Sequence, residues 1–252
     1  MTGPAGGFSH VAARAHEPLR TFHPRRSVLG PERQDALARL WPRWGFSVHD
    51  DAQGAMPRRA HDVLGEVLDL ERLFGRRAPV VLEIGSGMGE ATVAMAAADP
   101  DRDWLAVEAH LPGLAQLLVR VERAGLSNVR VAHGDALDLV RRRLPEESLD
   151  AVHAFFPDPW PKPRHHKRRL VQPEHVALLR SRLVRGGTLH VATDWTEYAE
   201  AMLVVLAADP GLENTVDGFV VPRPPQRPET KFERRGLDLG HEVRDLVFRR
   251  RA

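Results

Sequence analysis

The chain has 252 residues, of which 42% are hydrophobic and 28% are charged, and these proportions suit a soluble globular protein with one large domain and an appendage. Its formal net charge at pH 7 is only +2 and its sequence pI is about 9.5, so the distribution of charge, and not its total, must indicate the partners. Cysteine is absent, which excludes disulfides, thiolate zinc sites and a cysteine nucleophile and suits a reducing cytoplasm.

The first part of the chain has an irregular pattern. Residues 1–30 are rich in Gly, Pro, Ala, His and Arg and predict disorder at least at their start, and residues 1–16 have no apolar core of signal-peptide length. Three elements are expected next: a helix over residues 31–41, a loop over 45–57, and a helix over 58–74 that ends at Gly75. We therefore expect two parts, an N-terminal extension (1–57) and a main domain (58–252).

Strands and helices alternate in the main domain. Strands are predicted at residues 80–84, 104–107, 129–131, 149–155 and 188–192. Helices are predicted at residues 90–98, 114–124, 173–183 and 195–207. This alternation predicts an α/β fold, a doubly wound and mostly parallel sheet with helices on both faces. The longest apolar stretch, residues 201–208, is far too short to cross a bilayer, so no membrane contact is expected.

A glycine-rich turn follows the first of these strands. Gly85, Gly87 and Gly89 allow the backbone to turn sharply and to approach a ligand closely. In a doubly wound sheet such a turn lies at the ligand-binding edge. A dinucleotide-binding turn would have a further glycine at position 90, where this chain has Glu90, whose carboxylate is badly suited to a pyrophosphate.

Acidic residues stand at the ends of four strands: Glu83, Glu108, Asp135 and Asp158. Glu108 offers two acceptor oxygens to ribose hydroxyls, Asp135 with Ala136 suits an adenine edge, and Glu83 suits amide groups of the turn or a ligand ammonium. Each acid taken alone could instead cap a helix, an alternative that stays open above all for Asp135. As a set they favour a cationic cofactor such as S-adenosylmethionine over NAD, which carries two phosphates.

Lysine is rare and confined to two segments. Of the 36 basic residues only three are lysines: Lys162 and Lys167, which follow a Phe-Phe-Pro-Asp-Pro-Trp sequence, and Lys231, in a Thr-Lys-Phe-Glu sequence. A lysine retained in so arginine-rich a chain marks a place where a compact ammonium is needed. Residues 162–169 carry five Lys or Arg and two His beside aromatic residues, a mixture more typical of a nucleic-acid site than of a solvated face. Neighbouring histidines have the wrong spacing for two ligands on one helical face, so no metal is predicted.

Several segments resemble those of the bacterial tRNA (guanine-N7-)-methyltransferases. The matching segments are 83–89, 156–162 with 165–170, 193–195 with 198–200, and 230–236 with 239–241. The resemblance runs from about residue 58 to 249, with departures at Pro163 and Arg244, and is loose over the first 57 residues. It implies a class I methyltransferase, that is, a Rossmann-like, doubly wound, mostly parallel seven-stranded sheet.

The resemblance also implies a reaction and the residues that perform it. The expected reaction transfers the methyl group of S-adenosylmethionine to N7 of guanine in the tRNA variable loop, at tRNA position 46. Cofactor contacts are implied at Glu83, Glu108, Asp135 and Asp158, and Gly85, Gly87 and Ala136 complete the expected cofactor site. Substrate contacts are implied at Lys162, Asp194, Thr230, Lys231, Phe232 and Glu233, with Asp158 as the catalytic residue.

The chemistry of guanine suits these residues. N7 has a lone pair and no proton, so catalysis can rest on positioning and electrostatics without a strong base. Asp158 is expected to hold the guanine edge and to offset the positive charge that passes to the purine, and Asp194 and Glu233 to accept hydrogen bonds from guanine N1 and the exocyclic amine. The residues expected to hold tRNA phosphates or to stack on bases are Lys162, Arg164, Lys167, Arg168, Arg169, Trp160 and Phe156.

Two other functions fit parts of the pattern. A nicotinamide-dependent oxidoreductase would share the sheet and the glycine turn, but Glu90 and the lack of an obvious acid for hydride transfer count against it. A non-catalytic RNA-binding protein would keep the basic segment and tolerate loss of the strand-end acids. We therefore expect a cytoplasmic enzyme that acts on tRNA as a monomer or a weak homodimer.

Overall fold

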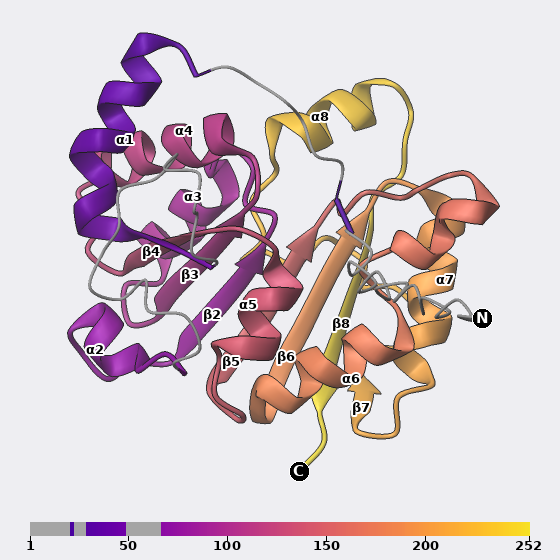
Figure 1. Ribbon diagram of the computed structural model, residues 1–252. Helices are drawn as coiled ribbons and strands as arrows, with labels where there is room; N and C mark the ends of the chain where they lie inside the picture. The colour runs from indigo at the N-terminus through magenta and orange to yellow at the C-terminus, as the bar shows by residue number, and fades with distance from the viewer. Residues whose placement is uncertain (1–20, 23–28, 49–66) are drawn as a thin grey trace, which may run out of the picture.

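An eight-stranded sheet between two layers of helices forms the protein (Figure 1). The computed structural model describes residues 21–22, 29–48 and 67–252, with the side chains of Lys231 and Phe232 excepted. The strands are β1 (Gly45–Ser47), β2 (Val80–Ile84), β3 (Asp103–Glu108), β4 (Val129–His133), β5 (Leu149–Phe155), β6 (Leu183–Thr193), β7 (Leu212–Asn214) and β8 (Arg244–Arg250). The helices are α1 (Pro31–Trp44), α2 (Leu70–Phe74), α3 (Glu90–Ala98), α4 (Leu111–Arg123), α5 (Ala136–Arg142), α6 (Pro173–Arg182), α7 (Thr196–Ala207) and α8 (Lys231–Asp238), with the 3-10 helix η1 (Pro163–Arg168).

The order of the strands places a crevice at the centre of the sheet. The order is β1-β4-β3-β2-β5-β6-β8-β7, and the six strands from β1 to β6 in this order are parallel. β8 runs antiparallel to β6, and β7 antiparallel to β8. The chain winds outward in one direction from β2 and in the other from β5, so the switch point lies between these two strands. Ligands of such sheets bind outside the carboxyl ends of the strands at this point.

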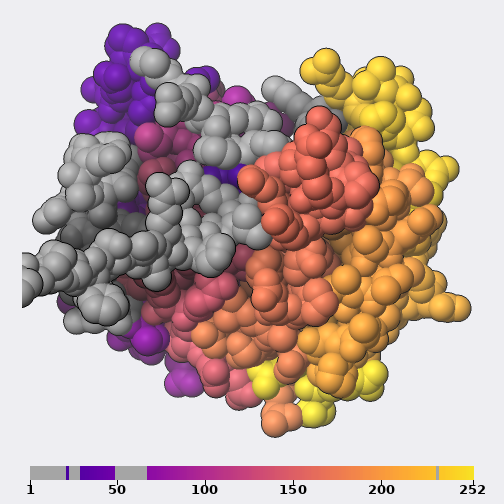
Figure 2. All heavy atoms as spheres, turned by 45° about the vertical axis from the view of Figure 1, so that its right-hand side comes forward, coloured from indigo at the N-terminus to yellow at the C-terminus, as the bar shows by residue number. Residues whose placement is uncertain are grey.

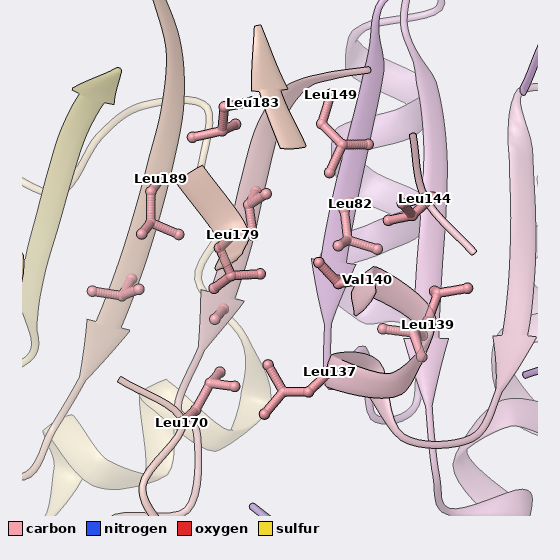
Figure 3. Close-up of a cluster of buried hydrophobic side chains, with 14 of the residues drawn as sticks. Leu82, Leu137, Leu139, Val140, Leu144, Leu149, Leu170, Leu179, Leu183 and Leu189 are labelled. Atoms are coloured by element: carbon pink, nitrogen blue, oxygen red, sulfur yellow. The ribbon is translucent and has the colours of Figure 1, made fainter. Parts of the chain in front are cut away.

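Alternate residues of the central strands bury opposite faces of the sheet. Val81 and Ala106 belong to a core with α1, α3 and α4. Their neighbours Leu82 and Leu105 belong to a second core with α5, α6 and α7. Figure 3 shows leucines of the second core, among them Leu137 of α5 and Leu179 of α6, pointing toward the strands. Apolar residues on both faces explain why the strands read as continuous hydrophobic runs.

The segment between residues 45 and 48 departs from the prediction. It was expected to be a loop in a chain with a seven-stranded sheet, but Gly45–Ser47 forms β1, an eighth strand that pairs with β4. Glycine is needed at position 45 because a Cβ there would lie 1.9 Å from the Trp41 ring. Phe46 is 1% exposed, and its burial against the second core favours the strand. The rest of the predicted loop lies outside the described residues.

The prediction of a helix over residues 58–74 is only partly tested. Residues 49–66 lie outside the described part, and residues 67–69 are not helical. The Asp69 carboxylate accepts a hydrogen bond from the Arg72 amide and so begins α2 at Leu70. The helix ends at Gly75, as predicted, where φ is +79°. No helix within the described ranges is long and apolar enough to cross a membrane.

Candidate functional site

A cavity of about 260 Å³ opens at the carboxyl ends of the central strands. Residues that follow β2, β3, β4 and β5 line it, which places it at the switch point of the sheet. Five of the predicted cofactor residues are among them: Gly85, Gly87, Glu108, Ala136 and Asp158. The described lining includes two acids and one histidine, His110, but no Lys or Arg. This lining suits a cationic ligand far better than a pyrophosphate.

The glycine turn and Glu108 hold each other in place. Gly87 has φ of +56°, and its N–H donates to Glu108 Oε2 at 2.8 Å. Glu108 Oε1 accepts from the His110 amide at 2.7 Å. α4 approaches so closely that a Cβ on Gly113 would lie 2.6 Å from the Gly87 carbonyl oxygen. Burial raises the pKa of the Glu108 carboxyl, against the opposing effect of the two amides. Each carboxylate oxygen still has a lone pair for a ligand hydroxyl.

Glu83 lies beneath the turn, near the end of β2. Its side chain is 3% exposed, and Oε2 has no hydrogen-bond partner among the described residues. Burial raises the pKa of the Glu83 carboxyl to about 7, the nearby Glu108 carboxylate adds to this shift, and the hydroxyl of Thr92 opposes it. An unpaired buried acceptor beside a cavity is the kind of group that a ligand's ammonium satisfies. Glu83 is not itself part of the cavity wall.

Glu83 makes a testable contribution to stability. Because its folded-state pKa is raised, the native chain binds more protons than the unfolded chain between about pH 4.5 and 7, and this part of the unfolding free energy falls as pH rises. His153, whose pKa burial lowers to about 3, acts in the opposite direction below pH 6.5. The contribution of His153 is the same in wild type and in Glu83→Gln. We therefore expect the difference in unfolding free energy between these two proteins to change by roughly 3 kcal/mol over this window. Urea unfolding of both proteins without ligand measures it, and a pH-independent difference would contradict the assignment.

Asp135 has the structural role that the sequence left open. It precedes α5, and its Oδ1 accepts from the amides of Leu137 (2.8 Å) and Asp138 (3.3 Å). Its side chain lines a separate hollow of about 200 Å³ together with Lys167, whereas Ala136 lines the main cavity. In this segment Ala136, and not Asp135, therefore lines the main cavity. α5 itself was not predicted, because it is a single short helix after a polar turn.

Asp158 sits on a constrained turn at the mouth of the cavity. The turn begins at Phe156, with φ of +53°, and ends at Trp160, with φ of +45°. Phe156 donates its amide to the Ala192 carbonyl at 2.7 Å, which ties the turn to the end of β6. Prolines on both sides of Asp158 fix the backbone between these points. Two non-glycine residues with positive φ within five positions indicate stored strain, which clusters at functional sites.

Trp160 supports this turn and is not available for base stacking. It is 3% exposed, and its indole N–H donates to the Thr21 carbonyl at 3.2 Å. Thr21 and Phe22 in turn line the cavity. These two residues were missed as site residues, although they lie within the first 57 residues, where the family match is loose. Of the two aromatic residues expected to stack, Phe156 alone lines the cavity.

Arg169 is buried and stabilises the Asp158 turn. The prediction that it contacts a phosphate is therefore wrong. Its Nε donates to the Pro159 carbonyl at 2.9 Å, and its other nitrogens pair with Glu197 at 2.9 and 2.5 Å. The guanidinium stacks 4.6 Å from the ring centroid of Tyr198, which is fully buried. Glu197 responds with a lowered pKa, chiefly because Arg169 donates to it. Arg169 therefore connects the Asp158 turn to α7.

The exposed members of the basic segment 162–169 lie on η1 or directly before it, beside this turn. Lys162, Arg164 and Lys167 are exposed, and Arg168 lies 5.1 Å from the Trp160 ring centroid. Figure 2 shows the salmon-coloured part of the chain that contains η1, and the yellow α8, at the same upper end of the molecule. The carboxyl ends of the parallel strands point to this end in Figure 1. Positive charge therefore gathers on the side where the cavity opens.

Apart from Lys162, which directly precedes η1, the predicted substrate residues are grouped around α8, outside the cavity wall. The Asp194 carboxylate lies 3.1 Å from His241 Nδ1. The Thr230 hydroxyl caps α8 by accepting from the Glu233 amide at 3.1 Å. Glu233 is 3% exposed, and both of its oxygens accept hydrogen bonds from Arg227. Lys231 and Phe232 begin the helix, but their side chains lie outside the described part.

The sequence of the chain matches a family of methyltransferases. The profile of a family described as “Putative methyltransferase” matches residues 77–246, which extend from before β2 into β8. The solved structure of the 16S rRNA methyltransferase KamB superposes with a TM-score of 0.56 at 19% identity, over 75% of this chain and 99% of that one, a likeness that concerns the fold alone. The fold and the family profile thus define a methyltransferase.

Close relatives show to which family of methyltransferases the chain belongs. A protein of Halorhodospira halophila named “tRNA (guanine-N(7)-)-methyltransferase” is 54% identical over 92% of this chain and 95% of its own length. One of Streptomyces avermitilis with the same name is 52% identical over 98% of this chain and 78% of its own length. The chain belongs to the family of bacterial tRNA (guanine-N7)-methyltransferases.

Proposed function

We propose that the protein transfers the methyl group of S-adenosylmethionine to N7 of a guanine in the tRNA variable loop, at tRNA position 46. The names of the relatives support the reaction. The observation that carries the proposal is the placement of Asp158, on a strained turn between the cavity and the basic surface of η1. We place this reaction in the cytoplasm, in keeping with a cysteine-free chain.

The residues in and beside the cavity fit S-adenosylmethionine. Glu108 offers acceptors for ribose hydroxyls, and the unpaired Oε2 of Glu83 offers one for the ammonium. The described wall has no Lys or Arg that would oppose a sulfonium or that would favour the phosphates of a nicotinamide cofactor. When bound, this cofactor supplies an electrophilic methyl group on its sulfonium. We therefore assign Glu83, Gly85, Gly87, Glu108, Ala136 and Asp158 to its site.

The chain's contribution to the reaction is positioning and charge. Guanine N7 carries no proton, so no residue has to act as a base before attack. Asp158 holds the guanine edge near the cavity and offsets the positive charge that the ring acquires, within a site where electrostatic interactions are strong. The strained turn and Arg169 keep Asp158 in place before the substrate arrives, so little reorganisation is needed during the reaction.

The surface of η1 supplies the contacts to tRNA phosphates. We expect Arg164→Ala or Lys167→Ala to weaken tRNA binding without changing the melting temperature, and to lower the slope of log K against log salt by about one. Arg169→Ala should instead destabilise the fold by roughly 1–3 kcal/mol, because it leaves the Pro159 carbonyl unpaired. Filter binding over a salt series and thermal unfolding of the three variants measure both effects. Equal melting temperatures for all three would contradict the division between exposed and buried cations.

The proposed reaction is tested by transfer of labelled methyl groups to tRNA transcripts. Two transcripts are compared, one with guanine and one with 7-deazaguanine at position 46, and the product is mapped by cleavage at 7-methylguanosine. Label on the first transcript and none on the second is expected. Label elsewhere in the tRNA would leave a methyltransferase with another target. Binding of tRNA without any label would favour a non-catalytic RNA-binding protein.

A further inference from the structure

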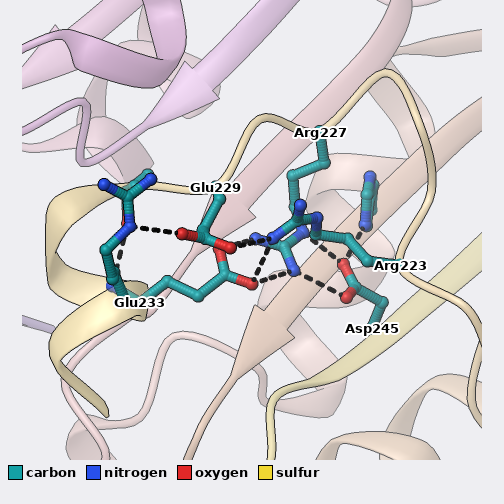
Figure 4. Close-up of polar contacts among 8 residues, drawn as sticks. Arg223, Arg227, Glu229, Glu233 and Asp245 are labelled. Carbon is teal, nitrogen blue, oxygen red and sulfur yellow. Dashed lines mark hydrogen bonds and ion pairs between the residues drawn. The ribbon is translucent and has the colours of Figure 1, made fainter. Parts of the chain in front are cut away.

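Arg227 is a fully buried cation that joins three parts of the fold. It lies in the segment between β7 and α8, and its side chain is 1% exposed. Nη1 and Nη2 donate to Glu233 of α8 at 2.6 and 2.9 Å, and Nε and Nη2 donate to Asp245 of β8 at 2.6 and 2.8 Å. Figure 4 shows the guanidinium between the two carboxylates. Asp245 also pairs with His190 of β6 at 2.7 Å, which anchors the network in the sheet.

The same guanidinium lies against the wall of the cavity. Its central carbon is 5.7 Å from the ring centroids of both Phe155 and Phe156. Both rings line the cavity, and Phe156 begins the strained turn that carries Asp158. A cation over aromatic rings at this distance is attractive, the more so when both groups are shielded from water. One residue thus contacts the entrance of the Asp158 turn and the first turn of α8.

Stability alone gives a weak reason for this arrangement. Burying charges costs several kcal/mol for each ion, and well-packed apolar residues often replace a buried ion pair without loss. What the planar guanidinium provides is fixed geometry, because its donors point to both carboxylates at once. A second, partly exposed arginine, Arg223, donates to Glu233 Oε1 at 3.1 Å, so two arginines hold the Glu233 carboxylate.

We propose that Arg227 is a positioning residue for methyl transfer, which through Glu233 and the Phe156 ring sets α8 at a fixed place relative to Asp158. Glu233 then acts by holding α8 and not by contacting guanine. The N-terminal turn of α8, capped by Thr230, is the part that Arg227 keeps in register with the cavity. This inference rests on the proposed function, because it assigns to α8 a place beside the methylated base.

The test separates positioning from general stabilisation. We compare wild type, Arg227→Met, Arg227→Lys and Glu233→Gln with the control Arg76→Met. Arg76 pairs with Asp103, which is 1% exposed, at 2.8 Å and at the opposite, amino ends of the strands. For each protein we measure kcat and KM for tRNA, the dissociation constant of S-adenosylmethionine by calorimetry, and the melting temperature.

We expect Arg227→Met to lower kcat by about 10- to 100-fold, the effect of a misplacement of about 1 Å, with less than a threefold change in cofactor affinity. Arg227→Lys should restore little of the lost kcat, because an ammonium cannot donate to both carboxylates in the same geometry. Glu233→Gln keeps the shape of the side chain, and its kcat should lie between those of wild type and Arg227→Met. It provides the test if Arg227→Met does not fold. Arg76→Met should lose stability and keep its kcat.

Unchanged kcat in the Arg227 and Glu233 variants, measured below their melting temperatures, would overturn the proposal. A loss of cofactor affinity as large as the loss of kcat would also overturn it, because the effect would then lie in the cavity wall and not in α8. An inactive wild-type protein would instead refute the proposed function, so the two failures are distinguishable.

Discussion

Replacing Asp158 with alanine should lower kcat for methyl transfer by about 100- to 1000-fold, the cost of removing one preorganised electrostatic group from a transition state. The expectation follows from its place, between two prolines on a turn with φ of +53° and +45° at its ends, at the mouth of the cavity. The strained backbone fixes the carboxylate before substrate binds, so its charge acts at full strength as the purine becomes positive. Single-turnover transfer to tRNA at saturating cofactor measures this step without product release.

Two further variants separate the charge of Asp158 from its shape. Asp158→Asn keeps the size of the side chain and some hydrogen bonding but removes the negative charge, and we expect most of the loss to persist. Asp150→Ala is the matched control, since Asp150 lies on β5 and pairs with Arg102 at 2.9 Å, near the amino end of the strand. Normal turnover in Asp158→Asn would show that hydrogen bonding and not charge is what this residue contributes.

The sequence predicted the parts of the site that depend on local pattern. Apolar runs followed by glycine or acidic residues located the ends of β2, β3, β4 and β5, and the ends of parallel strands necessarily meet at one edge. Gly85, Gly87, Glu108, Ala136 and Asp158 therefore came together around one cavity, as expected. The central strands were also predictable, because burial on both faces leaves an unbroken apolar signal.

The errors concern contacts between residues far apart in the chain. Trp160 was expected to stack on bases, but its indole donates a hydrogen bond to the carbonyl of Thr21, 139 positions earlier. Arg169 was read as one of a run of surface cations, but its partner Glu197 lies 28 positions later. A run of charges shows no difference between its exposed and its buried members until the fold is known. β1 escaped prediction for the same reason, since its partner strand β4 begins more than 80 residues later.

The contacts of Arg227 could not be predicted from the sequence around it. It stands in residues 222–228, a stretch of prolines, arginines and one glutamine that has no helical or strand period. Its two carboxylate partners come from α8 and β8. The substrate-side motif that contains Glu233 was recognised, but the direction of the Glu233 side chain, inward to Arg227, depends on how α8 packs. The sequence can identify such a motif without indicating which of its members face the ligand.

The affinity for S-adenosylmethionine should rise about fiftyfold between pH 5 and pH 7. Glu83, whose pKa is about 7 without ligand, must be ionised to accept the ligand's ammonium, and its ionised fraction rises from about 1% to about 50% over this range. Binding therefore releases a proton below pH 7. The range ends at pH 7 because the ligand's own α-amino group loses its proton near pH 8. Calorimetry in buffers of different ionisation enthalpy measures both the affinity and the proton release.

The Glu83→Gln variant isolates this effect. It should bind the cofactor more than tenfold more weakly at pH 7, since a buried charged hydrogen bond is lost, and the slope between pH 5 and pH 7 should largely disappear. Glu108→Gln should keep a slope but shift its midpoint to lower pH, because the Glu108 carboxylate raises the pKa of Glu83. If both variants retain the wild-type pH profile, another group holds the ammonium, and the unpaired oxygen of Glu83 is a feature of the ligand-free core alone.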